Sequence, residues 1–285
     1  MKNRLKQARG PAARIPYSIQ VTFSLLVFAA LTMLIYWPYL AGFRGLKLAV
    51  PLNSVAAAGG CFLLSRRWLA SFDASAIAGG IYGLGAFVLS FGLYHPLAGV
   101  CVAALPWLFC PAALWRQFAP ANLFTAAGRL ILLLLPFAWV AVFFWLPSQT
   151  WVGPVSLMPQ GRGPSPADLY ALAGLNLQAG SQIFLGLYPT AVILSLMGLF
   201  VYLKLLRIVL LIPVLAGAVL AFADPVLGVP PIVWTAVPML FLSILAGLGA
   251  QSFALAGPSD AGWVLICAVA AGAMAALAAL RYFLM

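Results

Sequence analysis

The amino-acid sequence predicts an all-α integral membrane protein, a polytopic helix bundle of about nine transmembrane helices with a short amphipathic helix on its outer surface. Two observations predict this class. The 285 residues are 65% hydrophobic and only 7% charged, with a mean hydropathy of +1.10, whereas a soluble domain carries roughly 25% charged residues. Apolar runs also follow one another along almost the whole chain, so no soluble segment is long enough to bury a core of its own.

Residues 1–17 form a basic tail, and residues 18–285 form a single transmembrane domain. The tail holds five of the 15 basic residues, and the others lie singly or in pairs between apolar runs. A net charge of +11 distributed in this way is typical of basic residues that set the orientation of membrane helices, and it does not form a nucleic-acid-binding stripe. The apolar run after the tail is longer than a signal-peptide core of about 7 to 15 residues, and no small-residue cleavage site follows it. We therefore expect this run to remain as the first membrane helix.

Nine apolar runs are long enough to cross a bilayer as helices. They cover residues 18–40, 46–65, 74–94, 96–115, 128–147, 181–203, 206–223, 227–250 and 261–283. The segment FADPVLGVPP interrupts the region of the seventh and eighth runs. Eight spans with a re-entrant segment is therefore the alternative topology.

The lysines and arginines predict the orientation. With the N-terminus in the cytoplasm, eleven basic residues fall inside and four outside, which is the expected positive-inside bias. The four outside are Arg44, Lys47, Arg162 and Arg281. Nine spans then place the C-terminus outside.

We expect a bacterial inner-membrane protein whose partners are the lipid bilayer and other membrane protein subunits, and no nucleic acid.

The one long loop, residues 148–180, is predicted to lie outside. Its first half is rich in Pro and Gly and should be irregular. In its second half, Ser165 can cap a helix, Pro166 occupies the first helical position, and Asp168 follows three residues after the cap. The apolar positions that follow predict a short helix on the outer membrane surface.

The chain lacks the residue sets that a metal, a haem or a catalytic centre needs. His95 is the single histidine, and the four cysteines, Cys61, Cys101, Cys110 and Cys267, are not spaced as in a structural zinc site. Cys101 and Cys110 would face opposite sides of one helix, about 13 Å apart along its axis, so they cannot form a disulfide. Cys101 and His95 do not share a helix face. We expect no cofactor, and a non-enzymatic role is favoured.

Three polar residues are candidates for contact with a substrate path or a partner. Asn53 lies inside the second span, where its amide must face another helix. His95 ends the third span before a proline, at an outer position that water reaches. Asp224 lies at the outer end of the seventh span, and no span has an acidic residue at its centre. The alternatives are an interhelical hydrogen bond for Asn53, an interfacial residue for His95 and a turn residue for Asp224.

Small residues four positions apart mark two faces along which helix backbones can approach closely. Gly79 and Gly83 form a GxxxG pattern in the third span, and Ala271, Ala275 and Ala279 repeat the spacing in the ninth. Such faces suit packing within the bundle and packing against a partner helix equally well.

Three functions are compatible with these features. The first is a non-catalytic membrane subunit that anchors or scaffolds a larger inner-membrane complex, which the small-residue faces and the short cytoplasmic loops favour. The second is a transporter or facilitator for a neutral or lipid-like substrate, which the prolines inside several spans favour, because broken helices are typical of transporters. The third is a lipid-modifying membrane enzyme whose site has no recognised motif.

Overall fold

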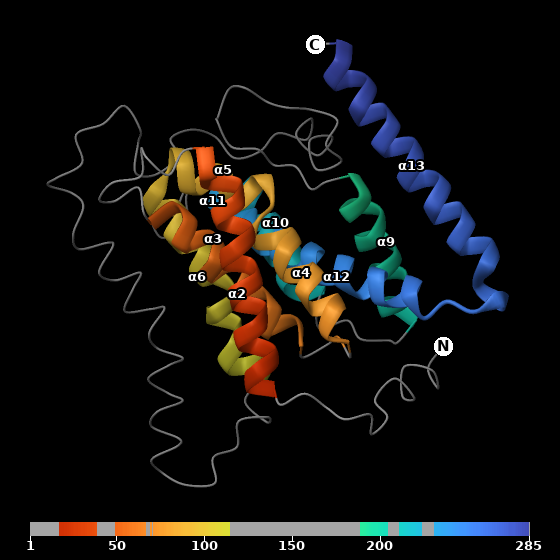
Figure 1. The fold of residues 1–285 in the computed structure, drawn as a ribbon, viewed down its shortest axis with the longest axis horizontal. Coiled ribbons are helices and arrows are strands. Elements are labelled where there is room, and N and C mark those ends of the chain that lie inside the picture. The colour runs from red at the N-terminus through yellow and green to blue at the C-terminus, as the bar shows by residue number, and fades with distance from the viewer. Residues whose placement is uncertain are drawn as a thin grey trace, which may run out of the picture.

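The structure is a computed structural model that describes residues 17–38, 49–66, 69, 71–114, 189–204, 211–223 and 231–284. Regular structure in this part of the chain is entirely helical, which confirms the all-α class (Figure 1). Three stretches are long and apolar enough to cross a membrane: Ser18–Tyr36, Phe72–Tyr94 and Pro231–Ala254. The chain therefore has the apolar helices of a membrane protein.

Helices occupy eight of the nine runs that the sequence predicts to be spans. They are α2 (Tyr17–Tyr36), α3 (Ala49–Ser65), α4 (Phe72–Gly83), α5 (Ala86–Tyr94), α6 (Pro96–Leu114), α9 (Pro189–Lys204), α10 (Leu211–Phe222), α11 (Pro231–Trp234), α12 (Ala236–Ala254) and α13 (Ala261–Leu284). The basic tail, the fifth run at 128–147 and the loop at 148–180 lie outside the described residues. The count of nine spans and the surface helix therefore stay predictions.

Two of the runs expected to be single helices are each divided in two. α4 ends at Gly83, and Gly85 takes an extended conformation before α5 begins. Thr235 separates α11 from α12. The second break has a clear cause, because Pro238 lacks a backbone N–H and its ring would collide with the carbonyl of Trp234 in a continuous helix.

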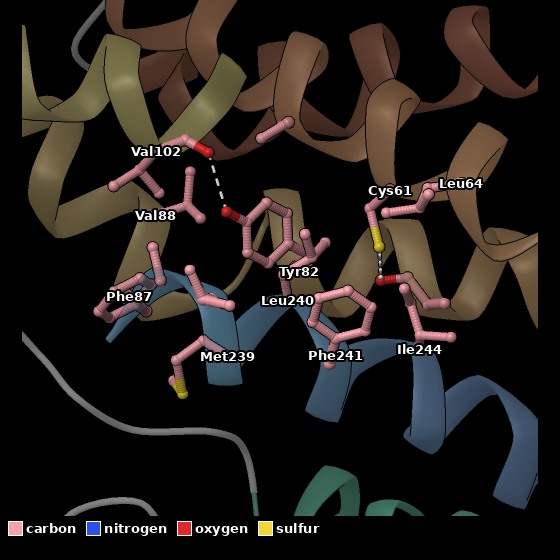
Figure 2. Close-up of a cluster of buried hydrophobic side chains, with 14 of the residues drawn as sticks. Cys61, Leu64, Tyr82, Phe87, Val88, Val102, Met239, Leu240, Phe241 and Ile244 are labelled. Carbon is pink, nitrogen blue, oxygen red and sulfur yellow. Dashed lines mark hydrogen bonds between the residues drawn. The ribbon is translucent and has the colours of Figure 1, made fainter. Parts of the chain in front are cut away.

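α12 is the central helix of the described bundle, and α4 and α9 lie on opposite sides of it. Toward α4, a Cβ atom at Gly247 would lie 2.5 Å from the Ala74 carbonyl oxygen. Figure 2 shows Leu240, Phe241 and Ile244 of α12 facing Tyr82 of α4 and the side of α3 that carries Cys61 and Leu64. The Tyr82 hydroxyl donates a 2.8 Å hydrogen bond to the Val102 carbonyl, which ties α4 to α6.

The GxxxG pattern of the third span is used inside the bundle. A Cβ atom at Gly79 would lie 2.7 Å from the Ala58 carbonyl oxygen, and one at Gly83 would lie 2.6 Å from the Ala58 Cα. α3 thus crosses α4 directly over these two glycines. The sequence did not decide whether this glycine face packs against a partner or within the bundle. In the structure, α3 covers it.

α9 and α12 cross with their backbones in contact. A Cβ atom at Gly198 would collide with the Leu245 carbonyl oxygen, and one at Gly249 would collide with the Leu194 carbonyl oxygen. The Ser195 hydroxyl also donates a 2.8 Å hydrogen bond to the Leu242 carbonyl. The close contacts are thus concentrated at one crossing point, between residues 194–198 of α9 and residues 242–249 of α12.

Three peripheral helices expose large apolar side chains. α2 exposes Ile19, Phe23, Leu26, Leu31 and Leu34; α10 exposes Ile212, Leu215, Val219 and Phe222; α13 exposes Leu265, Ile266, Val269 and Leu280. Exposed apolar surface of this extent is a liability in water and is ordinary in lipid. These faces are suited to contact with lipid chains or with another apolar protein surface.

Candidate functional site

Two of the candidate residues, Asn53 and His95, lie at the same end of the bundle. The N-terminal part of α3 meets the C-terminal part of α5 there, since a Cβ atom at Gly92 would lie 3.2 Å from Val50 Cγ1. Asn53 follows Val50 by three residues and His95 follows Gly92 by three residues, a rise of about 4.5 Å in each helix. α3 and α5 are antiparallel, so Asn53 and His95 are displaced in opposite directions from the Val50–Gly92 contact. Their Cα atoms are therefore about 9 Å apart along the direction of the helices.

Asn53 faces the interior of the bundle. Its side chain is 3% exposed, and it shares a helix face with Val50 and Ala57, which are also buried. Within the described residues, no group accepts a hydrogen bond from its Nδ2 atom. A buried amide with an unused donor is costly in an apolar environment, so this position has unfilled capacity to bind a hydrogen-bond acceptor.

His95 ends α5, as the sequence predicts, but it is not at a position that water reaches. Its backbone leaves the helical region at φ −137° and ψ 74°, and α6 begins at the next residue, Pro96. The side chain is only 6% exposed and its ring centroid lies 6.5 Å from that of Phe91. The expectation of exposure is wrong because α6 folds back on α5, where a Cβ atom at Gly99 would lie 2.9 Å from the Gly92 Cα.

Asp224 lies outside the described residues, so its predicted role stays untested. Two other aspartates are described. Asp73 is exposed in the first turn of α4, next to the Ser71 cap. Asp260 accepts hydrogen bonds from the Gly257 backbone N–H at 3.0 Å and from Trp263 Nε1 at 3.2 Å, and so it fixes the turn that precedes α13.

The structure adds two residues to this end of the bundle that sequence reasoning missed. Tyr36 at the C-terminus of α2 is buried, and its hydroxyl interacts with the Ser54 side chain of α3. Ser54 in turn donates to the Val50 carbonyl at 3.4 Å. We call Tyr36, Asn53, Ser54 and His95 the polar end of the bundle. A signal was present in the sequence, because Ser24, Thr32 and Tyr36 share one face of an otherwise apolar helix.

The cysteines are parts of the packed helices. Cys61 and Cys110 are buried, and the Cys61 thiol donates a 3.4 Å hydrogen bond to the Ala78 carbonyl (Figure 2). All four are free thiols. In the described ranges, no three residues among His, Cys, Asp and Glu lie close enough together to hold a metal ion. The chemistry that the side chains of the polar end offer is hydrogen bonding to oxygen or nitrogen atoms.

Comparison of the chain with protein-family models, with curated proteins and with solved structures finds no match.

Proposed function

We propose that this chain is a non-catalytic integral membrane subunit that anchors or scaffolds a larger membrane complex. The observation that carries the proposal is the placement of α13. This apolar helix of 24 residues packs against α9 and otherwise stands at the edge of the molecule (Figure 1). A helix placed in this way can contact a neighbouring subunit without disturbing the bundle behind it.

The glycines of α13 differ from the glycines at which helices cross elsewhere in the bundle. Gly79, Gly83, Gly198 and Gly249 each lie where a second helix backbone passes over them, whereas no atom lies within 4 Å of a Cβ placed at Gly272. Gly272 is the centre of an exposed row that also contains Ala268 and Ala276. Small residues at a helix surface allow another backbone to approach, and lipid chains gain little from them. A partner helix from another subunit fits this row.

Gly272→Leu is expected to release the partner subunit while leaving the chain folded. The leucine side chain would hold a partner backbone away from α13. The tagged protein is solubilised gently and its partners are quantified by mass spectrometry. We expect recovery of the main partner to fall at least tenfold relative to the unsubstituted protein, with an unchanged Tm.

Gly80→Leu on α4 is the matched control, because a Cβ at Gly80 also meets no atom within 4 Å. This variant should retain the partner. If the unsubstituted protein purifies reproducibly without any second membrane protein, the subunit role is wrong.

A second candidate function is a transporter or facilitator for a neutral or lipid-like substrate. The observation that favours it is the buried amide of Asn53 with its unused donor. Polar groups inside membrane helices often mark a substrate pathway. A facilitator for an uncharged substrate has no need of a titratable group, so Asp224 and His95 are not required for it.

Asn53→Leu is expected to abolish transport if this second function holds. The protein is reconstituted in liposomes that contain fluorescently labelled phosphatidylcholine, and movement of the label between leaflets is followed by chemical quenching. We expect the unsubstituted protein to accelerate this movement at least tenfold, and Asn53→Leu to return it to the protein-free rate. His95→Ala and Asp224→Asn should stay within about threefold of the unsubstituted rate. Unsubstituted protein that does not accelerate the movement would exclude this activity for this probe.

A further inference from the structure

α2 turns a mostly polar face toward the rest of the bundle. Its four buried residues are Ser24, Phe28, Thr32 and Tyr36, with exposures of 2%, 3%, 1% and 3%. They are spaced four apart, so they form one line along the helix. Three of the four carry a hydroxyl, although the opposite face of α2 is apolar and exposed. This arrangement is the reverse of what apolar packing alone would select.

The line lies against α3, with α4 beside it. The rings of Phe28 and Phe62 are 6.4 Å apart in an edge-to-face arrangement. Arg66 Nη2 donates to Gln20 Oε1 at 3.4 Å at one end of the contact, and Tyr36 meets Ser54 at the other. α2 and α3 are therefore antiparallel. We call the line of Ser24, Thr32 and Tyr36, with the α3 surface that it faces, the α2–α3 seam.

The hydroxyls of Ser24 and Thr32 behave unlike the other buried hydroxyls of serine and threonine. Ten buried serines and threonines are described. Eight of them donate to a carbonyl three or four residues earlier in the chain: Ser54, Ser65, Ser75, Ser90, Ser195, Thr235, Ser243 and Ser252. Ser24 Oγ and Thr32 Oγ1 make no hydrogen bond to any described residue. Both hydroxyls thus lack a described partner, and because they are buried, a ligand reaches them only by entering between α2 and α3.

We propose that the α2–α3 seam binds the uncharged hydroxyl and ester groups of a neutral membrane lipid. Two buried hydroxyls without partners are costly inside a bilayer, and a ligand that supplies oxygen atoms removes that cost. The sequences of α2 and α3 contain no charged residue. Arg66, which follows α3, bonds to Gln20 at one end of the contact, twelve residues and about 18 Å along α2 from Thr32, so the Thr32 end of the seam has no described cation to neutralise a phosphate. α2 is also the least buried of the three candidate spans, with 17% of its window buried, so lipid borders the seam directly.

A diacylglycerol has the chemistry that this surface would recognise. It presents one hydroxyl and two ester carbonyls, and these can donate to and accept from Thr32 near the C-terminal end of α2. Ser24 lies eight residues deeper, about 12 Å along the helix, so only an extended glycerol group reaches both hydroxyls. Its acyl chains are compatible with the exposed apolar face of α2. The site is independent of the proposed subunit role, because it lies on α2 and α3 whereas the proposed partner row lies on α13.

The test is retention of dioleoylglycerol by the purified full-length protein. The protein is delipidated in mild detergent, incubated with dioleoylglycerol and examined by native mass spectrometry. We expect the unsubstituted protein to retain the lipid and to gain thermal stability from it. Ser24→Ala combined with Thr32→Val should reduce retention at least tenfold and abolish the lipid-dependent rise in Tm. Ser243→Ala, which removes a buried hydroxyl that is already bonded within α12, should retain the lipid fully.

Two further arms define the result. If the double variant folds poorly, Thr32→Ser keeps the hydroxyl, and it should bind within about twofold of the unsubstituted protein. Dioleoylphosphatidylglycerol at equal concentration should not displace the neutral lipid. Equal retention by the unsubstituted protein and the double variant, or displacement by the anionic lipid, would overturn the proposal.

Discussion

Gly198→Ala on α9 should destabilise this protein strongly. The new Cβ atom would collide with the Leu245 carbonyl oxygen and would lie 2.7 Å from the carbonyl carbon and 3.1 Å from the Gly249 nitrogen. All of these are backbone atoms, so no side-chain rotation can relieve the overlap, and α9 must move away from α12. Overpacking of this kind costs about 1–3 kcal/mol and occasionally more. We expect about 3 kcal/mol, because the Ser195 hydrogen bond to Leu242 is lost as well.

The measurement is the Tm of the purified protein in detergent, together with the fraction that remains monodisperse. Gly80→Ala is the matched control, since a Cβ there meets nothing within 4 Å. Alanine is favoured over glycine in an exposed helix by about 1 kcal/mol, so this control should melt at the same temperature or higher. A Gly198→Ala protein with an unchanged Tm would show that α9 and α12 do not cross in this way.

Phe28→Ala should loosen α2 from the bundle. Phe28 is the one apolar residue in the buried line of α2. Its ring packs against Ala58, Phe62 and Gly79. In a water-soluble core this change costs about 3–5 kcal/mol. We expect about 2 kcal/mol, because lipid replaces water as the alternative environment and mainly the packing part is lost.

Limited proteolysis between α2 and α3 and the Tm in detergent test this prediction, and both should change in the Phe28→Ala protein. Leu34→Ala on the exposed face of the same helix should change neither, since Leu34 is 71% exposed. If the two variants melt at the same temperature, Phe28 does not anchor α2.

The distribution of hydropathy along the chain was sufficient to predict the all-helical class and most of the described helix positions. A run of some 20 residues without charge can satisfy its backbone in lipid only as a helix, so hydropathy locates the helices without any knowledge of their partners. The end of a helix at His95 is confirmed for a similarly local reason, because a proline follows. Prolines inside several spans favoured broken helices, but the sequence analysis treated residues 227–250 as one helix and did not place a division at Thr235.

Which face of each helix is covered depended on contacts between residues far apart in the sequence. The GxxxG pattern of Gly79 and Gly83 predicts close approach by a helix, and only the position of Ala58 on α3 identifies that helix. His95 was expected at a water-accessible end, and the return of α6 over Gly92 buries it.

Among the candidate site residues, the sequence determined chemical type and the tertiary structure decided environment. The amide of Asn53 and its place inside a span are local facts, whereas its burial and its unused donor depend on how the helices pack. The hydroxyls of α2 recur every fourth residue in the sequence, but periodicity does not tell whether such a line faces lipid or protein. Lipid and the protein interior are both apolar, so hydropathy cannot separate them, and only the packing of α2 on α3 turns Ser24 and Thr32 inward.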